Sequence, residues 1–300
     1  MSVRNGFLFC ADPLRPNRPD PHFAGEAAAV REAGGRVALI DHDALLAGDA
    51  AGAGARVVRD SGPYWYRGWM IPSARYAELE EALALRGCAL LTGAADYRLA
   101  HELPGWYGAF AHLTPHSVWR GTPLGGPGEL VALAAPLGRG PGIVKDFVKS
   151  RKHEWHEACF VPELTDRGRL VSVVGRFVGL QGEDLAGGVV LRTFEPFVPG
   201  GEARVWWLDG EPVLVTAHPD TPDRLPDPPL GPVREAVRRL GPRWVTTDLA
   251  LREDGAWRVV EVGDGQVSGL PAGAGAGELF AALATAGPRA RGSAPDRAAP

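Results

Sequence analysis

Two carboxylates lie in neighbouring apolar segments of the sequence. In TTDLALREDGAWRVVEVGDG (residues 246–265), Asp248 precedes and Glu261 follows Asp254–Gly255, a dipeptide typical of a β-hairpin turn. Such a hairpin can turn both carboxylates to one face, where paired hard oxygen ligands suit Mg²⁺ bound to a polyphosphate. The alternative is that both are ordinary solvent-facing strand residues, although an unpaired acid in an apolar strand is costly.

A second group of charged residues is basic. Lys145 lies inside the apolar segment IVKDFV, and Lys149, Arg151 and Lys152 follow, which places four cations within eight residues. Cations at this density can hold the oxygens of a triphosphate. The segment is also explained by a solvated basic turn, with Lys145 as an edge residue whose ammonium reaches water. In either case it is polar, and we expect it to become ordered when phosphate binds.

The segment LRTFEPFVPGGEARVWWLDGEPV (residues 191–213) contains a strand-to-loop hinge followed by a charged residue in an apolar strand. The hinge consists of Glu195, Pro196, Phe197 and Val198. Its backbone can present polar groups to the edge of an adenine ring. Arg204 then needs an anionic partner, which a phosphate, Glu202 or a buried carboxylate could supply. Arg192 raises the same question.

The aromatic segment YRGWM (residues 66–70) suggests a binding surface for the substrate that accepts the activated group. Arg67 lies between Tyr66 and Trp69, where an arginine can bind a carboxylate and cover an apolar group. An interdomain packing cluster with a salt-bridged Arg67 is the equal alternative. Ser268, just after the predicted metal hairpin, could face the same substrate.

The order of apolar segments predicts an α/β protein. Strands are expected at residues 6–10, 36–40 and 88–92, a β-prone segment at 63–70, and helices at 22–35 and 73–87, the second capped by Ser73. This βαβ opening indicates a parallel sheet. Further along, residues 142–148 predict a strand, 169–182 fit a helix or a strand, and two segments with Asp–Gly turns predict hairpins. From about Gly287 we predict a disordered tail.

Composition excludes several classes of protein. The net charge of −4 over 300 residues argues against a general nucleic-acid binder. The sequence has no apolar run long enough for a membrane span and no secretory signal, so we expect a cytoplasmic protein. The three cysteines fit neither a disulfide framework nor a zinc site. His153 and His156 could share a helix face, but no third metal-type ligand is near them in the sequence.

Taken in order, these features resemble the ATP-grasp superfamily. The shared order is a strand bearing Lys145, a hinge bearing Glu195, a Glu-x-Arg strand and a hairpin with Asp248 and Glu261. The segments VKDFVKSRK, YRGWM and VEVGDGQVSGLP resemble an uncharacterised bacterial branch with an Arg/Lys-rich phosphate loop, over residues 60–272. The resemblance implies an α/β (α+β) ATP-grasp fold. Its parts would be an N-terminal βαβ pre-ATP-grasp domain (1–115), a small lobe (116–195), a C-terminal lobe with the metal site (196–286) and the tail (287–300).

The resemblance also implies roles for single residues. Lys145 and Arg204 would be catalytic, contacting the nucleotide phosphates and the transferring phosphoryl group. Glu195 through Val198 would bind adenine and ribose, and Lys149, Arg151 and Lys152 would assist with phosphate. Asp248 and Glu261 would hold Mg²⁺. Where the family often has Asn, two residues after the metal-binding Glu, this sequence has Gly263, and Asp264 is the nearest substitute. Arg67, Trp69, Arg192 and Ser268 would bind substrate.

The function implied is that of an ATP- and magnesium-dependent carboxylate–amine ligase acting through an acyl phosphate. Its partners would be small-molecule or peptide carboxylates and amines, with no nucleic acid and no membrane, and a homodimer is left open. Two alternatives use the same nucleotide site. One is a small-molecule kinase on this fold, and the other is a non-catalytic nucleotide-binding protein.

Overall fold

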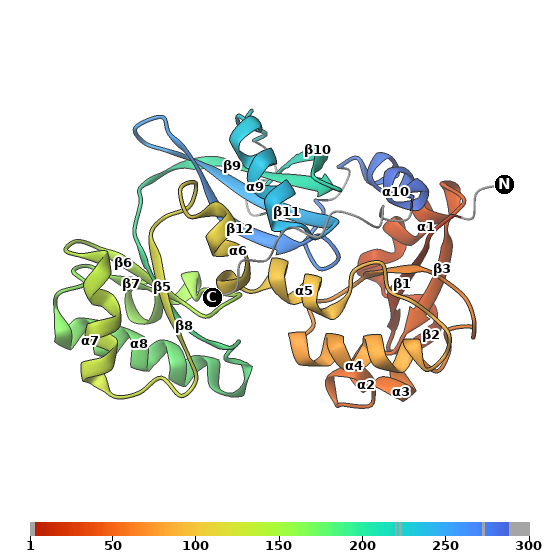
Figure 1. Cartoon of the computed structure of the whole chain (residues 1–300), viewed down its shortest axis with the longest axis horizontal. Coiled ribbons are helices and arrows are strands. Elements are labelled where there is room, and N and C mark those ends of the chain that lie inside the picture. The colour runs from red at the N-terminus through yellow and green to blue at the C-terminus, as the bar shows by residue number, and fades with distance from the viewer. Residues whose placement is uncertain (1–3, 220, 222–223, 272–273, 288–300) are drawn as a thin grey trace.

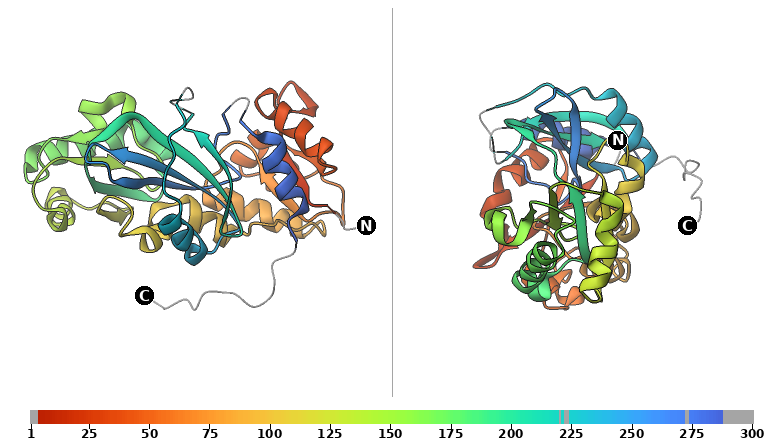
Figure 2. Two further views of the ribbon diagram at one scale, coloured as in Figure 1. Left: turned by 90° about the horizontal axis from the view of Figure 1, so that it is seen from above. Right: turned by 90° about the vertical axis from the view of Figure 1, so that its left-hand side faces the viewer.

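The computed structural model describes residues 4–219, 221, 224–271 and 274–287. The predicted tail at 288–300 therefore lies outside the described residues. Three sheets follow one another along the long axis of the molecule, with helices packed around them (Figures 1 and 2). Among the described residues, none of the helices combines the length and the apolar composition that a membrane span requires.

The N-terminal sheet is the parallel sheet that the sequence predicts. Strand β1 (Gly6–Asp12) lies between β3 (Arg36–Ile40) and β4 (Tyr64–Arg67), parallel to both, and β2 (Arg15–Pro19) pairs with its end. The helices of this region are η1 (Pro21–Phe23), α1 (Ala24–Glu32), α2 (His42–Leu46), α3 (Ala50–Ala53) and α4 (Ser73–Ala84).

Two local predictions in this region differ from the structure. Residues 88–92 form a single bridge, Leu90 to Tyr64, rather than a strand, because Gly87 ends the preceding turn with φ +73° and the next helix begins at Ala94. Ser73 is the first residue inside α4, not its cap, and its hydroxyl donates to Glu102.

The second sheet is antiparallel and carries the basic segment at one end. Its order is β5 (Ser117–Gly121), β8 (Gly188–Thr193), β6 (Gly142–Lys145) and β7 (Phe160–Val161). The segment that fits helix or strand is helix α8 (Arg167–Gln181), which starts where Asp166 accepts from the Arg169 N–H and buries Leu170, Val173, Val174 and Phe177 at helical spacing. The remaining helical segments are α7 (Pro127–Ala134), η2 (Ala135–Leu137), η3 (Lys152–Glu154), η4 (Trp155–Cys159) and η5 (Gly182–Asp184).

The central sheet consists of the two predicted hairpins. Its order is β10 (Glu211–Ala217), β9 (Phe197–Leu208), β11 (Trp244–Arg252) and β12 (Trp257–Asp264), all antiparallel. The β9–β10 turn, Asp209–Gly210, has positive φ at both positions (52° and 84°), as a two-residue hairpin turn of type I′ requires. Helices α5 (Ala94–His101), α6 (Leu103–Phe110) and α9 (Gly231–Leu240) belong to this part of the molecule, and the last two share an apolar core with the sheet.

An aromatic cluster joins the central sheet to the N-terminal sheet. Helix α10 (Ala276–Thr285) lies beside α1, as Figure 1 shows, and inserts Phe280 between Phe7 and Trp244. Trp65 packs edge-on against Trp244 at 5.7 Å. Since the two sheets share this core, and α5 and α6 pack on the central sheet, the domain boundaries at residues 115 and 195 stay a proposal.

Candidate functional site

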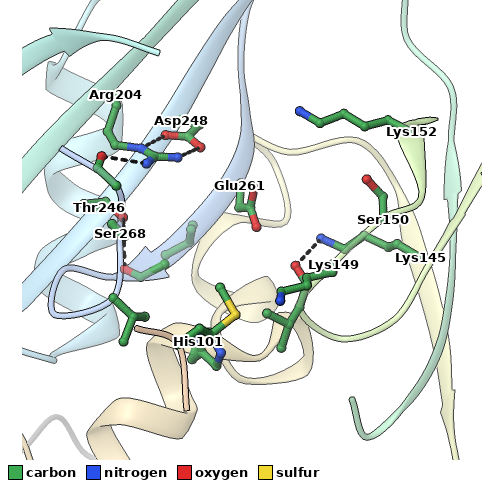
Figure 3. Close-up of a pocket in the computed structure, with 16 residues that line it drawn as sticks. His101, Lys145, Lys149, Ser150, Lys152, Arg204, Thr246, Asp248, Glu261 and Ser268 are labelled. Carbon is green, nitrogen blue, oxygen red and sulfur yellow. Dashed lines mark hydrogen bonds and ion pairs between the residues drawn. The ribbon is translucent and has the colours of Figure 1, made fainter. Parts of the chain in front are cut away.

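A pocket of about 310 Å³ opens where the central sheet, the basic segment and helix α5 meet (Figure 3). It brings together seven of the residues that the sequence analysis singles out. They are Lys145, Lys149, Lys152, Arg204, Asp248, Glu261 and Ser268. These residues come from four segments up to 123 positions apart, so the fold alone assembles them.

Three of these residues form what we call the charged row: Arg204, Asp248 and Glu261. Asp248 of β11 lies directly opposite Arg204 of β9 on one side and Glu261 of β12 on the other. Residues opposite one another on adjacent strands project to the same face of a sheet. The prediction that the Asp–Gly hairpin turns both carboxylates to one face is therefore confirmed.

The partner of Arg204 is Asp248, the buried-carboxylate alternative. The guanidinium donates from Nε to Oδ1 and from Nη2 to Oδ2, both at 2.7 Å, and from Nη1 to the Gly269 carbonyl at 3.0 Å. Burial alone would raise the pKa of Asp248, but Arg204 outweighs it and holds this pKa at about 2. Burial likewise opposes the charge of Arg204, and Asp248 more than offsets it, so the pKa of Arg204 is raised. Both groups are charged in the free protein.

Glu261 has a different environment within the same row. Its side chain is exposed, and its carboxylate forms no hydrogen bond or ion pair with any residue that the structure describes. It lies close enough to Lys145 and Arg192 to raise the pKa of each. Glu261 is thus a hard oxygen donor facing the pocket without a protein partner, as a cation ligand requires.

Residues 145–152 form the opposite wall, and we call them the lysine loop. Strand β6 ends at Lys145 because the Asp146 side chain turns the chain back, accepting from the backbone N–H groups of Val148 and Lys149. The loop is not short of core residues, as we expected, because Phe147 and Val148 are buried in the core of the central sheet.

The two kinds of lysine in the loop differ in burial. Lys145 is only 7% exposed, and its ammonium donates to the Val148 carbonyl at 3.3 Å. Burial lowers its pKa, and the nearby Glu261 carboxylate opposes this. Lys149 and Lys152 are exposed at the mouth of the pocket. Lys145 therefore lacks the water that would otherwise solvate its charge, and a bound anion would replace that water.

Lysine itself is a signal that the sequence analysis missed. The chain contains three lysines, all in the lysine loop, and its other 29 basic residues are arginines. A chain that uses arginine everywhere else keeps lysine at the pocket alone. Since a compact ammonium binds phosphate as a point charge and a planar guanidinium binds it as a fork, this usage indicates a specific need for lysine.

Several residues predicted to bind ATP lie outside this pocket. Arg151 pairs with Glu154 and donates to Gln181, and the Glu195 carboxylate accepts from Arg258 at 2.9 and 3.1 Å. Pro196 precedes β9, while Phe197 and Val198 are its first residues. Their backbone remains a candidate for the adenine edge, but the Glu195 side chain is engaged in joining the hinge to the β11–β12 hairpin.

The position of Asp264 argues against its predicted metal role. It is fully buried, lies three residues after Glu261 and so on the other face of β12, and does not line the pocket. Burial raises its pKa to about 7. The space beside Gly263 holds hydroxyls instead: a Cβ there would lie 3.1 Å from Thr246 Oγ1 and 3.2 Å from Ser268 Oγ, which are 2.6 Å apart. These two hydroxyls occupy the region into which the family's Asn would project.

The predicted substrate residues divide in the same way. Arg67 is 1% exposed, pairs with Glu26 at 2.6 and 2.7 Å, and donates to the carbonyls of Gln266 and Ser268. It is an interdomain salt-bridged residue and is not available to a substrate carboxylate. Trp69 donates to Asp20 and does not line the pocket, whereas its neighbour Met70 does.

Arg192 and Ser268 complete the predicted set. Arg192 is buried and donates to the Ser117 hydroxyl and the Val260 carbonyl, which joins β8 to β12. Its Nη2 has no hydrogen-bond partner within the described chain. Ser268 lines the pocket and is paired with Thr246.

Other pocket residues were not predicted. Thr246 could have been found by alternation, since it lies two residues before Asp248 on β11 and shares its face. Glu202 and His218 place ligand atoms within 4.8 Å of one another and of Asp248, and burial raises the pKa of Glu202 to about 7. His101 comes from α5, and nothing in the sequence around it indicates a site.

Comparison with known proteins agrees with this geometry. A sequence model that describes an ATP-grasp domain, family 3 of its clade, matches residues 134–283, half of the chain. The fold is that of ATP-grasp proteins, as the sequence analysis predicts. The chain belongs to this family of ATP-grasp domains. No curated protein matches it.

Solved structures share the fold at low sequence identity. The chain is similar to a RimK domain ATP-grasp protein from Sphaerobacter thermophilus DSM 20745 (16% identity, TM-score 0.60, covering 93% of this chain and 99% of that one). It is also similar to the D-cycloserine synthetase DcsG (16%, 0.62, 93% and 98%). A third structure is the ATP-grasp ligase PsnB complexed with minimal precursor, Mg and ADP (16%, 0.52, 92% and 96%).

Proposed function

We propose that this protein is an ATP- and magnesium-dependent ligase that joins a carboxylate to an amine through an acyl phosphate. The observation that carries the proposal is one pocket in which three lysines face an unpaired Glu261 and the Arg204–Asp248 pair. Neither wall alone has both charges that a magnesium–triphosphate needs. PsnB, which has this fold, is a ligase complexed with Mg and ADP, and DcsG is a synthetase. We keep the cytoplasmic location as part of the proposal.

The residues present suit a magnesium ion. Glu261 offers a carboxylate with no partner among the described residues, and Asp248, directly opposite, offers a second once Arg204 releases one of its oxygens. Carboxylates are ligands that Mg²⁺ prefers. When bound there, the ion would neutralise charge on the phosphate oxygens.

The chain's own residues then have distinct tasks. Lys145 holds a phosphate oxygen from a buried position, and Lys149 and Lys152 add charge at the mouth of the pocket. Arg204 already has its fork oriented by Asp248 and the Gly269 carbonyl, so it can donate to the transferring phosphoryl group with little reorganisation. The buried loop residues Phe147 and Val148 hold this wall against the sheet.

The proposed reaction has two steps. A substrate carboxylate oxygen attacks the γ-phosphorus of ATP, the bond to the β-phosphate oxygen breaks, and an acyl phosphate and ADP form. An amine nitrogen then attacks the acyl carbon, the carbon–oxygen bond to phosphate breaks, and an amide, inorganic phosphate and a proton result. Positioning and charge stabilisation account for most of the catalysis in such phosphoryl transfers.

The test is a screen for ADP formation with amino acids and small carboxylic acids, with and without added amines, followed by mass spectrometry of the products. The proposal predicts that ADP release requires a carboxylate and rises when the matching amine is added, with the condensed product detected. ADP release with a stable phosphorylated product and no response to amines would instead identify a kinase. Binding of ATP without any turnover would contradict both enzymatic functions.

A further inference from the structure

We infer that His101 is a catalytic residue that receives the proton of the attacking amine. This inference rests on the proposed function, because it concerns the second step of that reaction. The amine must lose a proton as its nitrogen bonds to the acyl carbon, and the carbon–oxygen bond to phosphate breaks in the same step. The proton would pass to an imidazole nitrogen of His101 and from there to solvent or to the departing phosphate.

The first argument is elimination among the groups that line the pocket. Within the described chain, the basic side chains there are Lys145, Lys149, Lys152 and Arg204, which have no vacant lone pair when charged. Asp248 is held ionised by Arg204 and has a pKa of about 2, so it is too weak a base. Glu261 is the ligand expected for magnesium. The hydroxyls of Ser150, Thr246 and Ser268 are weaker bases still, and His101 remains.

The second argument is the hydrogen bonding of His101. The residue is 6% exposed and lies on the helical wall of the pocket, close to Lys149 (Figure 3). Neither of its ring nitrogens is hydrogen-bonded to a described residue, although a buried polar group without a partner is costly. A substrate N–H would supply the missing partner.

The third argument is that His101 is held rigidly. Its ring stacks on Tyr97 with centroids 4.9 Å apart, and Tyr97 stacks on Tyr76 at 4.1 Å and 3°. The Tyr97 hydroxyl donates to the Ile71 carbonyl at 2.7 Å, which fixes the middle ring. Beyond α5, the Leu103 N–H donates to the Phe147 carbonyl, which ties this wall to the lysine loop. A catalytic base needs such a fixed position.

The charges around His101 favour the neutral imidazole. Burial, Lys149 and Lys145 lower its pKa to about 4, so the ring holds a lone pair at neutral pH. The same two lysines are expected to bind phosphate. Anionic phosphate beside them would offset their charge and raise the basicity of His101 when the substrates are loaded. Glu261 is the acid that faces the two lysines, and Tyr97 is the titratable group on His101's own helix.

The experiment separates the two steps with hydroxylamine, a nucleophile that is already neutral at pH 7. Each proteinogenic amino acid, and succinate, is supplied with Mg-ATP and hydroxylamine, and hydroxamate is measured with iron(III). The best carboxylate is then supplied with the pooled amino acids as amines, and amide is measured by mass spectrometry. His101→Phe keeps a ring on Tyr97 but has no nitrogen, and His112→Phe, at an exposed histidine outside the pocket, is the control. Melting temperatures check folding, and His101→Gln replaces His101→Phe if the latter does not fold.

We expect His101→Phe to bind ATP and form hydroxamate within about threefold of the parent, while amide formation falls by about 10²-fold or more, the usual contribution of a general base. Equal amide formation by parent and variant would overturn the inference and leave the ligase proposal intact. An equal loss of hydroxamate and amide would overturn it too, because His101 would then act before the second step. A parent that forms neither product would refute the proposed function, and the role of His101 with it.

Discussion

The charged row and the lysine loop form opposite walls of one pocket, but the fold positions them by different means. In the charged row, strand register places Arg204, Asp248 and Glu261 side by side. In the lysine loop, one Asx turn at Asp146 and the burial of Phe147 set the path of the chain. The row neutralises most of its own charge through the Arg204–Asp248 pair, whereas the loop gathers cations beside the single unpaired Glu261. The walls should therefore respond differently to substitution: the row in turnover, the loop in nucleotide affinity.

The largest expected effect is from Glu261→Gln. The amide keeps the size of the side chain but loses the charge of the one carboxylate in the row without a protein partner, and a bound cation contributes several kcal/mol to phosphoryl transfer. We expect ADP formation to fall by at least about 10²-fold. Glu253→Gln, in the exposed β11–β12 turn, is the matched control and should leave the rate unchanged. Parental turnover in Glu261→Gln would show that the row holds no metal.

The next effect is from Arg204→Lys. Lysine keeps the charge but cannot make the two parallel bonds to Asp248 and still point at phosphate. We expect kcat to fall about 10–10²-fold with ATP affinity changed less than about threefold, the pattern of a group that acts mainly in the transition state. Arg243→Lys breaks a similar bidentate pair with Asp209 outside the pocket and controls for stability. If Arg204→Lys weakens ATP binding and leaves kcat unchanged, Arg204 is a ground-state contact.

A smaller effect is expected at the mouth of the lysine loop. Lys149→Ala and Lys152→Ala should each weaken Mg-ATP binding by about three- to tenfold, because both side chains are exposed and neighbouring cations share the charge. Lys149→Arg and Lys152→Arg should recover part of the loss. Titration calorimetry measures all four variants. A loss as large as that from Lys145→Ala would mean that the loop acts as one cooperative unit rather than as a buried lysine with two auxiliaries.

The smallest effect on turnover should come from Asp264→Asn, which tests whether Asp264 belongs to the row. Its folded pKa of about 7 lies above the unfolded value of about 3.9, so the folded state binds its proton more tightly and stability falls as pH rises from about 4 to 7. Asparagine removes this loss, and the variant should be more stable than the parent at pH 8 by on the order of 2–4 kcal/mol, with less difference at pH 4.5. Denaturant unfolding at both pH values measures this. A strong loss of ADP formation would restore Asp264 as a metal ligand.

The sequence allowed prediction of the central sheet because local signals specify it. The two Asp–Gly turns fix the hairpins, and alternation then places Asp248 and Glu261 on one face. The same logic failed where tertiary contacts decide. Arg67 has its partner Glu26 on α1, 41 positions earlier, and its carbonyl acceptors lie about two hundred positions later, so its burial is not visible in YRGWM. Glu195 is likewise engaged by Arg258, which the chain brings back only through β12.

The central claim is that both walls hold one magnesium–triphosphate, and titration calorimetry with ATP tests it most directly. The parent, Lys145→Ala and Glu261→Gln are each titrated with ATP in excess Mg²⁺ and in EDTA. The account predicts tighter binding by the parent with Mg²⁺, binding by Lys145→Ala that is at least about tenfold weaker but still tightened by Mg²⁺, and binding by Glu261→Gln that Mg²⁺ no longer tightens. Parental affinity in Lys145→Ala, or a parent that binds ATP equally well in EDTA, would contradict it.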